Sequence, residues 1–376
     1  MADYRAYLDH NATAPLRPEA RAAAIAAMDM VGNASSVHRE GRQAHGMIER
    51  ARGEVASLVG ARPEMVTFTS GGTEANNLAI FGAPVERIVT SPTEHPSVIE
   101  PARASGRDLI MIHTSADGVI NLDHLAELLA DPRPTLVSVM AANNETGTVQ
   151  PIREIAQLAH EHGALFHVDA VQAAGRLSLA WPVLGADMMS LSGHKLGGPQ
   201  GAGALIAGEN LDLAPHIWGG GQEKRRRAGT ENVAAIAGFG AAAKVAQDSL
   251  AREQVRLSAL RDHFEAAFIK LAPDAVIFGA KADRLANTSC FAIPGLSAQL
   301  VLVALDLDGI AVSSGSACSS GKVARSHVLT AMGVDDALSA GAIRVSLGWS
   351  STADDIDRLL GSLARIIERK RTQRAA

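Results

Sequence analysis

Between residues 66 and 207, short runs of β-branched and other apolar residues alternate with segments of helical pattern. The runs cover residues 66–69, 87–91, 109–113, 136–140, 165–168 and 188–192. Strands that alternate with helices are typical of a mostly parallel sheet with helices on its faces. We therefore expect an α/β fold, whose ligand would lie beyond the carboxyl ends of the strands.

The chain has 376 residues, which is more than one ordinary core needs, so we expect two domains. An Ala-rich helical stretch over residues 231–271 has no strong strand signal and is expected to connect them, with the boundary near Leu250. We predict a large domain over residues 15–250 and a smaller α/β domain over residues 1–14 and 251–376. In the second part we expect strands at 289–293, 310–313 and 343–347, and helices at 299–306, 324–332 and from 353 onward.

Composition excludes several classes of protein. Apolar residues make up 47% and charged residues 20%, as in ordinary globular proteins. The net charge of −5 gives no basic footprint for nucleic acid, and no apolar run approaches the ~20 residues that cross a bilayer. The first residues show no features of a signal peptide. We expect a cytoplasmic small-molecule enzyme without nucleic-acid or membrane partners, and we assign no metal ligands.

An acid and an amine follow two of the apolar runs: Asp169 ends His167-Val168-Asp169, and Lys195 ends Ser192-Gly193-His194-Lys195. An aldehyde cofactor with a pyridine ring needs such a pair, because a lysine holds its carbonyl and a carboxylate keeps the ring nitrogen protonated. The pair predicts pyridoxal 5'-phosphate chemistry in the large domain. Gln172 would reach the phenolic oxygen. Taken alone, Lys195 could also be an exposed lysine at a strand end.

The segment Phe68 to Asn77 runs from a strand through Gly71 and Gly72 into a helix. Free backbone N–H groups and the positive helix end would bind a phosphate there. The alternative is a simple helix start with Thr73 as the capping residue. The segment lacks the lysine of a P-loop and the spacing of a dinucleotide fingerprint, so ATP and NAD are poorly supported. Ser192 and His194 can donate to the same phosphate.

Polar residues also follow two other runs. His95 lies at a strand-to-helix turn, where an imidazole can stack on an aromatic ring and move protons near neutral pH. It could instead only stabilise the turn. Asn144 lies in Asn143-Asn144-Glu145-Thr146-Gly147, although paired asparagines are also common in loops.

The two cysteines are expected to be thiols, because a single disulfide in a chain of this length without a signal peptide is improbable. Cys290 lies in an apolar run and is expected to pack in a core. Cys318 lies in a stretch of small polar residues, where a thiol on a mobile loop could reach a substrate. Lys322 or Arg325 could lower its pKa. The alternative is an incidental surface cysteine.

Arg344 is the single positive charge in the apolar run 342–347. Burial of a guanidinium without an anion is unfavourable, so a carboxylate partner is implied. An amino-acid substrate could supply it through a two-pronged contact, and a structural Asp or Glu is the alternative. A run such as 224–227, Lys-Arg-Arg-Arg, is usually solvated, and the alternative is that it surrounds an anionic group.

Eight segments together resemble the class V aminotransferase-related cysteine desulfurases of the NifS and IscS type. The match spans nearly the whole chain, and the order and spacing of the segments agree with the family. The segments are Tyr7-Leu8-Asp9 with Asn11-Ala12-Thr13, Gly32-Asn33 with Ser35-Ser36 and His38, Thr69 to Glu74, Thr93-Glu94-His95, Asn143-Asn144-Glu145, His167-Val168-Asp169, Ser192 to Lys195, and Ser313 to Cys318.

The resemblance implies a fold type I homodimer with a mostly parallel seven-stranded sheet in its large domain, and a small domain that carries the Cys318 loop. It also implies a role for each candidate residue. Lys195 would hold the cofactor, Asp169 pair with its ring nitrogen, Gln172 and Asn144 lie by its phenolic oxygen, His95 stack on its ring, Gly72, Thr73, Ser192 and His194 bind its phosphate, Thr230 reach the phosphate of the neighbouring subunit, and Arg344 bind the substrate carboxylate. Asn144 would also contact the substrate.

The implied reaction converts L-cysteine to L-alanine. Lys195 would remove the Cα proton, and the Cys318 thiolate would attack the substrate sulfur and hold it as a persulfide for an acceptor such as an iron–sulfur scaffold. Three positions depart from the family pattern, His10, Ala14 and Ala34, and they bear on fine specificity. The alternatives are a selenocysteine lyase, another pyridoxal phosphate aminotransferase or a sulfur-assembly scaffold without catalysis.

Overall fold

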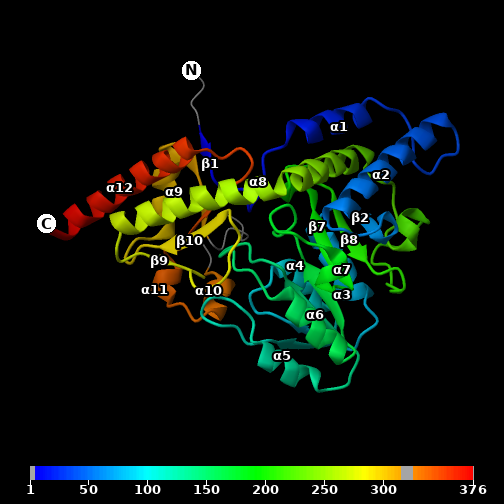
Figure 1. Cartoon of the computed structure of the whole chain (residues 1–376), viewed down its shortest axis with the longest axis horizontal. Coiled ribbons are helices and arrows are strands. Elements are labelled where there is room, and N and C mark those ends of the chain that lie inside the picture. Colours follow the sequence, from blue (N-terminus) through cyan, green and yellow to red (C-terminus); the bar gives the residue numbers. More distant parts are fainter. Residues whose placement is uncertain (1–4, 315–324, 376) are drawn as a thin grey trace.

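A seven-stranded sheet forms the larger body of the molecule (Figure 1). The computed structural model describes residues 5–314 and 325–375. The strand order is β2-β8-β7-β6-β5-β3-β4. β8 pairs antiparallel with both β2 and β7, and the remaining pairs are parallel. The strands are β2 (Val66–Thr69), β3 (Arg87–Thr90), β4 (Asp108–Met111), β5 (Thr135–Met140), β6 (Leu165–Asp169), β7 (Met188–Ser192) and β8 (Gly203–Ala207). The expected α/β class with a mostly parallel sheet is confirmed.

Helices cover this sheet. Five of its seven strands, β2, β3, β5, β7 and β8, are buried along their whole length, which explains their continuous apolar runs. Several helices begin at residues whose side chains cap backbone N–H groups, such as Asn121 before α5. The helices of this body are α1 (Pro18–Met28), α2 (Arg39–Leu58), α3 (Gly72–Gly82), α4 (Pro96–Ala104), α5 (Leu122–Leu129), α6 (Ile152–Glu161) and α7 (Trp181–Leu184), with 3-10 turns η1 (Pro63–Met65), η2 (Gly193–Lys195) and η3 (Gln222–Arg225).

A second, antiparallel sheet of order β12-β13-β10-β9 lies beside the first body (Figure 1). The expected strand at 310–313 is two short strands, because Ile310–Ala311 pairs with the chain start and Ser313–Ser314 pairs with β13. The elements are β1 (Ala6–Tyr7), β9 (Val276–Ile277), β10 (Thr288–Ala292), β11 (Ile310–Ala311), β12 (Ser313–Ser314), β13 (Ile343–Ser346), α9 (Ala298–Leu307), α10 (His327–Ala331), α11 (Asp336–Ser339) and α12 (Ala353–Ala375).

The long helix α8 (Val233–Leu271) runs along both bodies (Figure 1). Its first half, with Ile236 and Phe239, packs in the core that includes the seven-stranded sheet. Its second half, with Phe264 and Phe268, packs in the core of the second sheet. The expected connecting helix is therefore present without a break at Leu250, and the division of the chain into domains at that residue stays a prediction.

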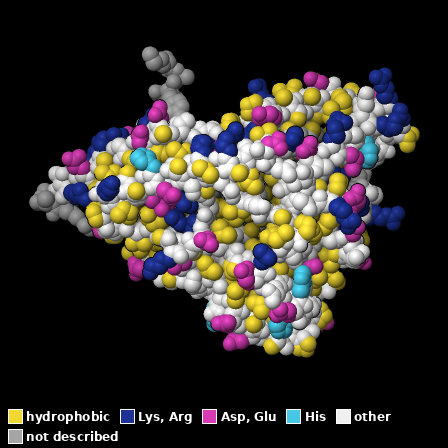
Figure 2. Space-filling model, viewed as in Figure 1, with side chains coloured by type: hydrophobic (Ala, Val, Ile, Leu, Met, Phe, Trp, Pro, Cys, Tyr) yellow, Lys and Arg dark blue, Asp and Glu magenta, His cyan; other side chains and the backbone are white. Residues whose placement is uncertain are grey.

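On the face shown in Figure 2, acidic and basic side chains are interspersed. Among the helices of residues 5–314 and 325–375, none is both long enough and apolar enough to cross a membrane.

A buried ion pair joins α2 to β2 and η3. Arg52 Nη2 lies 2.7 Å from Glu223 Oε1, and Arg52 Nη1 lies 2.8 Å from Oε2. The backbone N–H of Phe68 donates to the same carboxylate at 2.7 Å. Glu223 adopts a positive φ of 43°, a conformation that non-glycine residues rarely adopt. The pair therefore holds an irregular loop against the strand that leads into Gly71 and Gly72.

We expect Glu223→Gln to lower the free energy of unfolding by about 3 kcal/mol, because it leaves the Arg52 charge buried without a counter-charge. The measurement is urea unfolding followed by circular dichroism. Glu100→Gln is the control, since its pair with Arg103 is exposed and is worth less than about 1 kcal/mol. Equal effects of the two changes would contradict the structural role of the buried pair.

Candidate active site

A cavity of about 280 Å³ lies where β5, β6 and β7 end. It is lined by residues from both bodies of the molecule, including ten of the twelve candidate residues. Those ten are Gly72, Thr73, His95, Asn144, Asp169, Gln172, Ser192, His194, Lys195 and Arg344. This arrangement agrees with the expectation that side chains from separate strand ends meet at one edge of the sheet.

Helix α3 presents its N-terminus to the cavity. Its N-cap is Gly71, and no side chain caps the first N–H groups, so Thr73 is not the capping residue. A Cβ at Gly72 would lie 2.7 Å from Val171 Cγ2, so glycine is required for this close approach. These features fit an anion-binding helix end.

His194 and Ser192 lie at the same part of the cavity lining. Burial lowers the pKa of His194 to about 4, and the nearby Lys195 adds to the shift. The imidazole is therefore neutral at pH 7 and can contribute a hydrogen bond, but no positive charge, to an anion. Its Nδ1 contacts Thr13 Oγ1 at 3.1 Å.

Asp169 ends β6 as a buried carboxylate held by two donors. Asn76 Nδ2 donates to its Oδ2 at 2.7 Å, and the backbone N–H of Val171 donates to its Oδ1 at 3.0 Å. Hydrogen bonds of this kind fix the orientation of the carboxylate.

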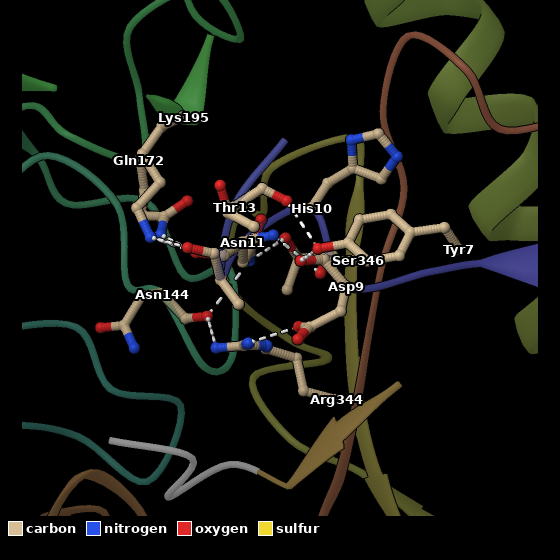
Figure 3. Close-up of polar contacts among 12 residues, drawn as sticks. Tyr7, Asp9, His10, Asn11, Thr13, Asn144, Gln172, Lys195, Arg344 and Ser346 are labelled. Carbon is tan, nitrogen blue, oxygen red and sulfur yellow. Dashed lines mark hydrogen bonds and ion pairs between the residues drawn. The ribbon is translucent and has the colours of Figure 1, made fainter. Parts of the chain in front are cut away.

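Lys195 ends η2, and its ammonium group meets the first residues of the chain. Nζ donates to the backbone oxygen of Asn11 at 2.6 Å and to that of Ala12 at 2.7 Å. Gln172 Nε2 donates to the same Asn11 oxygen at 3.0 Å (Figure 3). The N-terminal segment thus lies between Lys195 and Gln172 on one side and Arg344 on the other (Figure 3).

Arg344 lies on β13 and is only 3% exposed. Its Nη2 lies 2.7 Å from Asp9 Oδ1, and its Nη1 donates to the backbone oxygen of Asn144 at 3.1 Å (Figure 3). Its Nε is buried without a hydrogen-bond partner among the described residues. Asp9 is therefore a structural acid that pairs with Arg344, which was one of the two alternatives for its anionic partner. The guanidinium still lines the cavity.

The residues present fit pyridoxal 5'-phosphate. An uncapped helix end beside two polar side chains suits its phosphate, an ionised buried carboxylate suits its ring nitrogen, and a lysine suits its aldehyde. Asp169 and Lys195 line the same cavity from adjacent parts of one sheet, as the sequence predicts.

Two candidate residues remain. Thr230 is exposed and does not line the cavity. Cys318 lies outside the described residues. The other cysteine, Cys290, is fully buried, and burial raises the pKa of its thiol, so the expectation that it packs in a core is confirmed.

Side chains of the basic run 224–227 bind groups of the protein itself. Arg227 Nε pairs with Glu74 at 2.9 Å, Arg226 donates to the Leu211 carbonyl, and Lys224 donates to the Glu64 carbonyl. Three of its residues border a second cavity of about 950 Å³, which is far larger than the first and is lined by neither Lys195 nor Asp169.

Sequence reasoning missed three residues that shape the site: Asn11, Asn76 and Ser97 all line the cavity. Asn76 lies four residues after Gly72, one helical turn along α3, so the helical period could have placed it on the same face. Asn11 belongs to one of the segments that carry the family resemblance, but no role was assigned to it, and nothing in the sequence pattern distinguishes Ser97.

Comparison with known proteins gives consistent results. The family model described as "Aminotransferase class-V" matches residues 6–359. A relative from Dictyoglomus turgidum named "Cysteine desulfurase IscS" is 40% identical over 376 residues, covering 97% of this chain and 95% of the relative. A solved NifS-like protein from Rickettsia africae has a TM-score of 0.90 at 37% identity, covering 97% of this chain and 100% of that one. A structure described as "SspA in complex with cysteine" has a TM-score of 0.79 at 31% identity, covering 93% and 100%.

A second buried acid, Glu145, lies beside the cavity. Ser326 Oγ donates to its Oε2 at 2.6 Å. Burial raises the pKa of Glu145 to about 7, although Ser326 and Arg344 oppose the shift. The folded state therefore holds a proton on Glu145 at pH values where the unfolded chain has lost it.

We expect the contribution of Glu145 to the free energy of unfolding to fall as pH rises from about 4.5 to about 7, because only the folded state keeps the Glu145 proton in that window. The buried neutral rings of His167 and His194 contribute in the opposite direction, so the variant is compared with the unmodified protein at each pH. Glu145→Gln should remove this contribution and gain about 3 kcal/mol relative to the unmodified protein between pH 5 and pH 8. The measurement is urea unfolding at both pH values. Glu154→Gln, which removes an exposed acid, is the control. An identical pH slope for Glu145→Gln and the unmodified protein would contradict the assignment.

Proposed function

Because the chain belongs to the aminotransferase class-V family, and within it to the cysteine desulfurases, we propose that it converts L-cysteine to L-alanine and passes the sulfur to Cys318 as a persulfide. The observation that carries the proposal is the shared cavity of Lys195, Asp169 and Arg344. An amine, an acid and a guanidinium around one cavity suit an amino-acid substrate on a pyridine cofactor.

Pyridoxal 5'-phosphate, when bound, supplies an electron sink for the bond-breaking steps at the amino acid. Gly72, Thr73, Ser192 and His194 would hold its phosphate, Asp169 its ring nitrogen and Lys195 its aldehyde. His95 would lie against the ring, and Gln172 and Asn144 would lie near the phenolic oxygen. Asn76 and Val171 keep Asp169 oriented toward that position.

Arg344 would bind the carboxylate of the incoming cysteine. Its Nη2 already meets one carboxylate, that of Asp9, and its buried Nε has a hydrogen without an acceptor among the described residues. A substrate carboxylate beside the guanidinium would supply that acceptor. The cysteine bound to a protein of similar structure supports the same substrate class.

Lys195 would move protons at the substrate Cα. In this structure its Nζ donates to two backbone carbonyls, which orient the amine. In the sulfur step, the Cys318 thiolate would form an S–S bond with the substrate sulfur. The substrate C–S bond would break with its electron pair on carbon, and that carbon would take a proton to become the methyl group of alanine.

We also propose a homodimer in which Thr230 contributes to the site of the neighbouring subunit. The exposed position of Thr230, outside the cavity of its own chain, supports this arrangement. A sulfur acceptor such as an iron–sulfur scaffold would take the persulfide sulfur. The cytoplasmic location stays a prediction.

Lys195→Ala is expected to abolish the visible absorption band of the purified protein, because no other lysine lines the cavity among the described residues. The measurement is the absorption spectrum before and after addition of pyridoxal 5'-phosphate and desalting. Lys244→Ala is the control, since that exposed lysine pairs with Asp248 on α8. A preserved band in Lys195→Ala would exclude Lys195 as the attachment point.

Cys318→Ser is expected to keep the absorption band but to reduce cysteine-dependent sulfide release to the protein-free background, because a hydroxyl cannot carry the persulfide. Sulfide and alanine are measured together in the presence of a reducing thiol. Cys290→Ser changes the other, buried cysteine and should retain turnover in whatever fraction folds. Full turnover by Cys318→Ser would remove that residue from the mechanism.

A further inference from the structure

Two polar side chains, those of Asn76 and Ser97, connect the carboxylate of Asp169 to the ring of His95 through hydrogen bonds. Asn76 Nδ2 lies 2.7 Å from Asp169 Oδ2 and 2.8 Å from Ser97 Oγ. Ser97 Oγ lies 2.8 Å from His95 Nδ1. Asn76 and Ser97 are both buried. The connection therefore runs through the protein interior, where water competes little for these hydrogen bonds.

The direction of each hydrogen bond is fixed by chemistry. A carboxylate only accepts, so the Asn76 atom beside Asp169 is the amide nitrogen, and one of its two hydrogens is used there. Its second hydrogen goes to Ser97 Oγ. Because that hydroxyl accepts from Asn76, its single hydrogen is directed to His95 Nδ1.

The backbone gives an independent reason for the same polarity. His95 caps helix α4, and its Nδ1 accepts from the backbone N–H of Ser97 at 3.1 Å. A backbone N–H can only donate, so Nδ1 must present a lone pair. In the neutral ring the proton then resides on Nε2, at the opposite edge from α4.

We propose that Ser97 and Asn76 are positioning residues that hold His95 as the Nε2–H tautomer and link it to Asp169. This role rests on the proposed function, in which His95 lies against the cofactor ring, and deepens it. In this state His95 acts as a hydrogen-bond or proton donor through Nε2 and cannot accept a proton there. Proton removal from the substrate is thereby assigned to Lys195.

The groups around His95 are consistent with a neutral ring. The charged or titratable groups of Asp169, Lys195 and His327 interact electrostatically with the His95 ring. Burial lowers its pKa, Asp169 opposes the shift, and Lys195 and His327 add to it. A proton on Nδ1 would also face the backbone N–H of Ser97, which disfavours the imidazolium further.

The test is nitrogen NMR of the full-length purified protein with labelled histidine, because ring nitrogens with and without a proton have well-separated shifts. The chain has 13 histidines, so the His95 signals are identified as those lost in His95→Gln. We expect Nδ1 unprotonated and Nε2 protonated at pH 7.5. A proton on Nδ1 would overturn the proposal.

Ser97→Ala removes the hydroxyl donor but keeps the backbone cap, so α4 should still form. The His95 pKa should rise by about 0.5 to 1 unit, because the neutral ring loses one hydrogen bond. Ser97→Thr keeps a hydroxyl and should restore the original titration. Ser105→Ala, at the other end of α4, is the matched control, since Ser105 Oγ donates only to the Ala102 carbonyl. An unchanged titration in Ser97→Ala, or an equal shift in Ser105→Ala, would overturn the proposal.

Asn76→Ala should shift the His95 pKa in the same direction, because the Ser97 hydroxyl loses the donor that sets its orientation. Asn77→Ala is its matched control, as Asn77 is only partly buried and donates to the Thr73 carbonyl. Alanine formation from cysteine is measured on the same samples. If the tautomer depends on Ser97 while the unmodified protein makes no alanine, the proposed function fails and the role of Ser97 holds. If the unmodified protein makes alanine while the His95 tautomer does not depend on Ser97, the proposed function holds and the role of Ser97 fails.

Discussion

The buried amide of Asn11 joins the two bodies of the molecule, and the candidate site depends on that junction. The side chain is only 1% exposed, so each of its polar atoms needs a partner in the protein. Toward the second sheet, it contacts Thr288 Oγ1 at 2.9 Å and Asn287 Nδ2 at 3.1 Å, and its backbone N–H donates to Ser346 Oγ at 2.9 Å. Toward the first sheet, its side chain donates to the Asn144 carbonyl and its own carbonyl accepts from Gln172 and Lys195. Because every position is used, the two bodies meet in one fixed arrangement, and Arg344 from one faces Lys195 from the other.

The sequence allowed the first sheet and most of its site residues to be predicted, because both follow from local pattern. Each parallel strand is a continuous apolar run, and a polar residue just beyond its end falls at the carboxyl edge of the sheet. Asp169, Lys195 and His95 were placed in this way. Arg344 was identified by its lone charge on an apolar strand, which required an anion, and the family resemblance implied that this anion is the substrate carboxylate. The short strands β9, β11 and β12 were harder, since pairs of two residues leave no periodic signal.

What the sequence could not reveal was contact between residues far apart in the chain. Asn11 and Asn287 are 276 positions apart, and neither follows a strand of the first sheet. Arg52 and Glu223 lie 171 positions apart, and the positive φ of Glu223 contradicts local preference. Ser97 looked like an ordinary first-turn residue of a helix. Its importance comes only from the distance between its hydroxyl and two side chains that other elements deliver.

The buried histidines in and beneath the site are neutral, and hydrogen bonds orient their rings. Burial lowers the pKa of His194 to about 4 and that of His167 to about 3, so these rings are neutral at pH 7. His167 contacts hydroxyl groups on both sides, Ser138 Oγ at 2.9 Å and Ser190 Oγ at 2.9 Å, in the layer beneath the site. With its histidines neutral, the cavity keeps its full charges on few side chains, chiefly Asp169, Lys195 and the Asp9–Arg344 pair. A phosphate at the end of α3 would then be bound by directed N–H and O–H groups. The amine of Lys195 would remain for attachment of an aldehyde, and the positive charge of Arg344 would remain for capture of a substrate carboxylate.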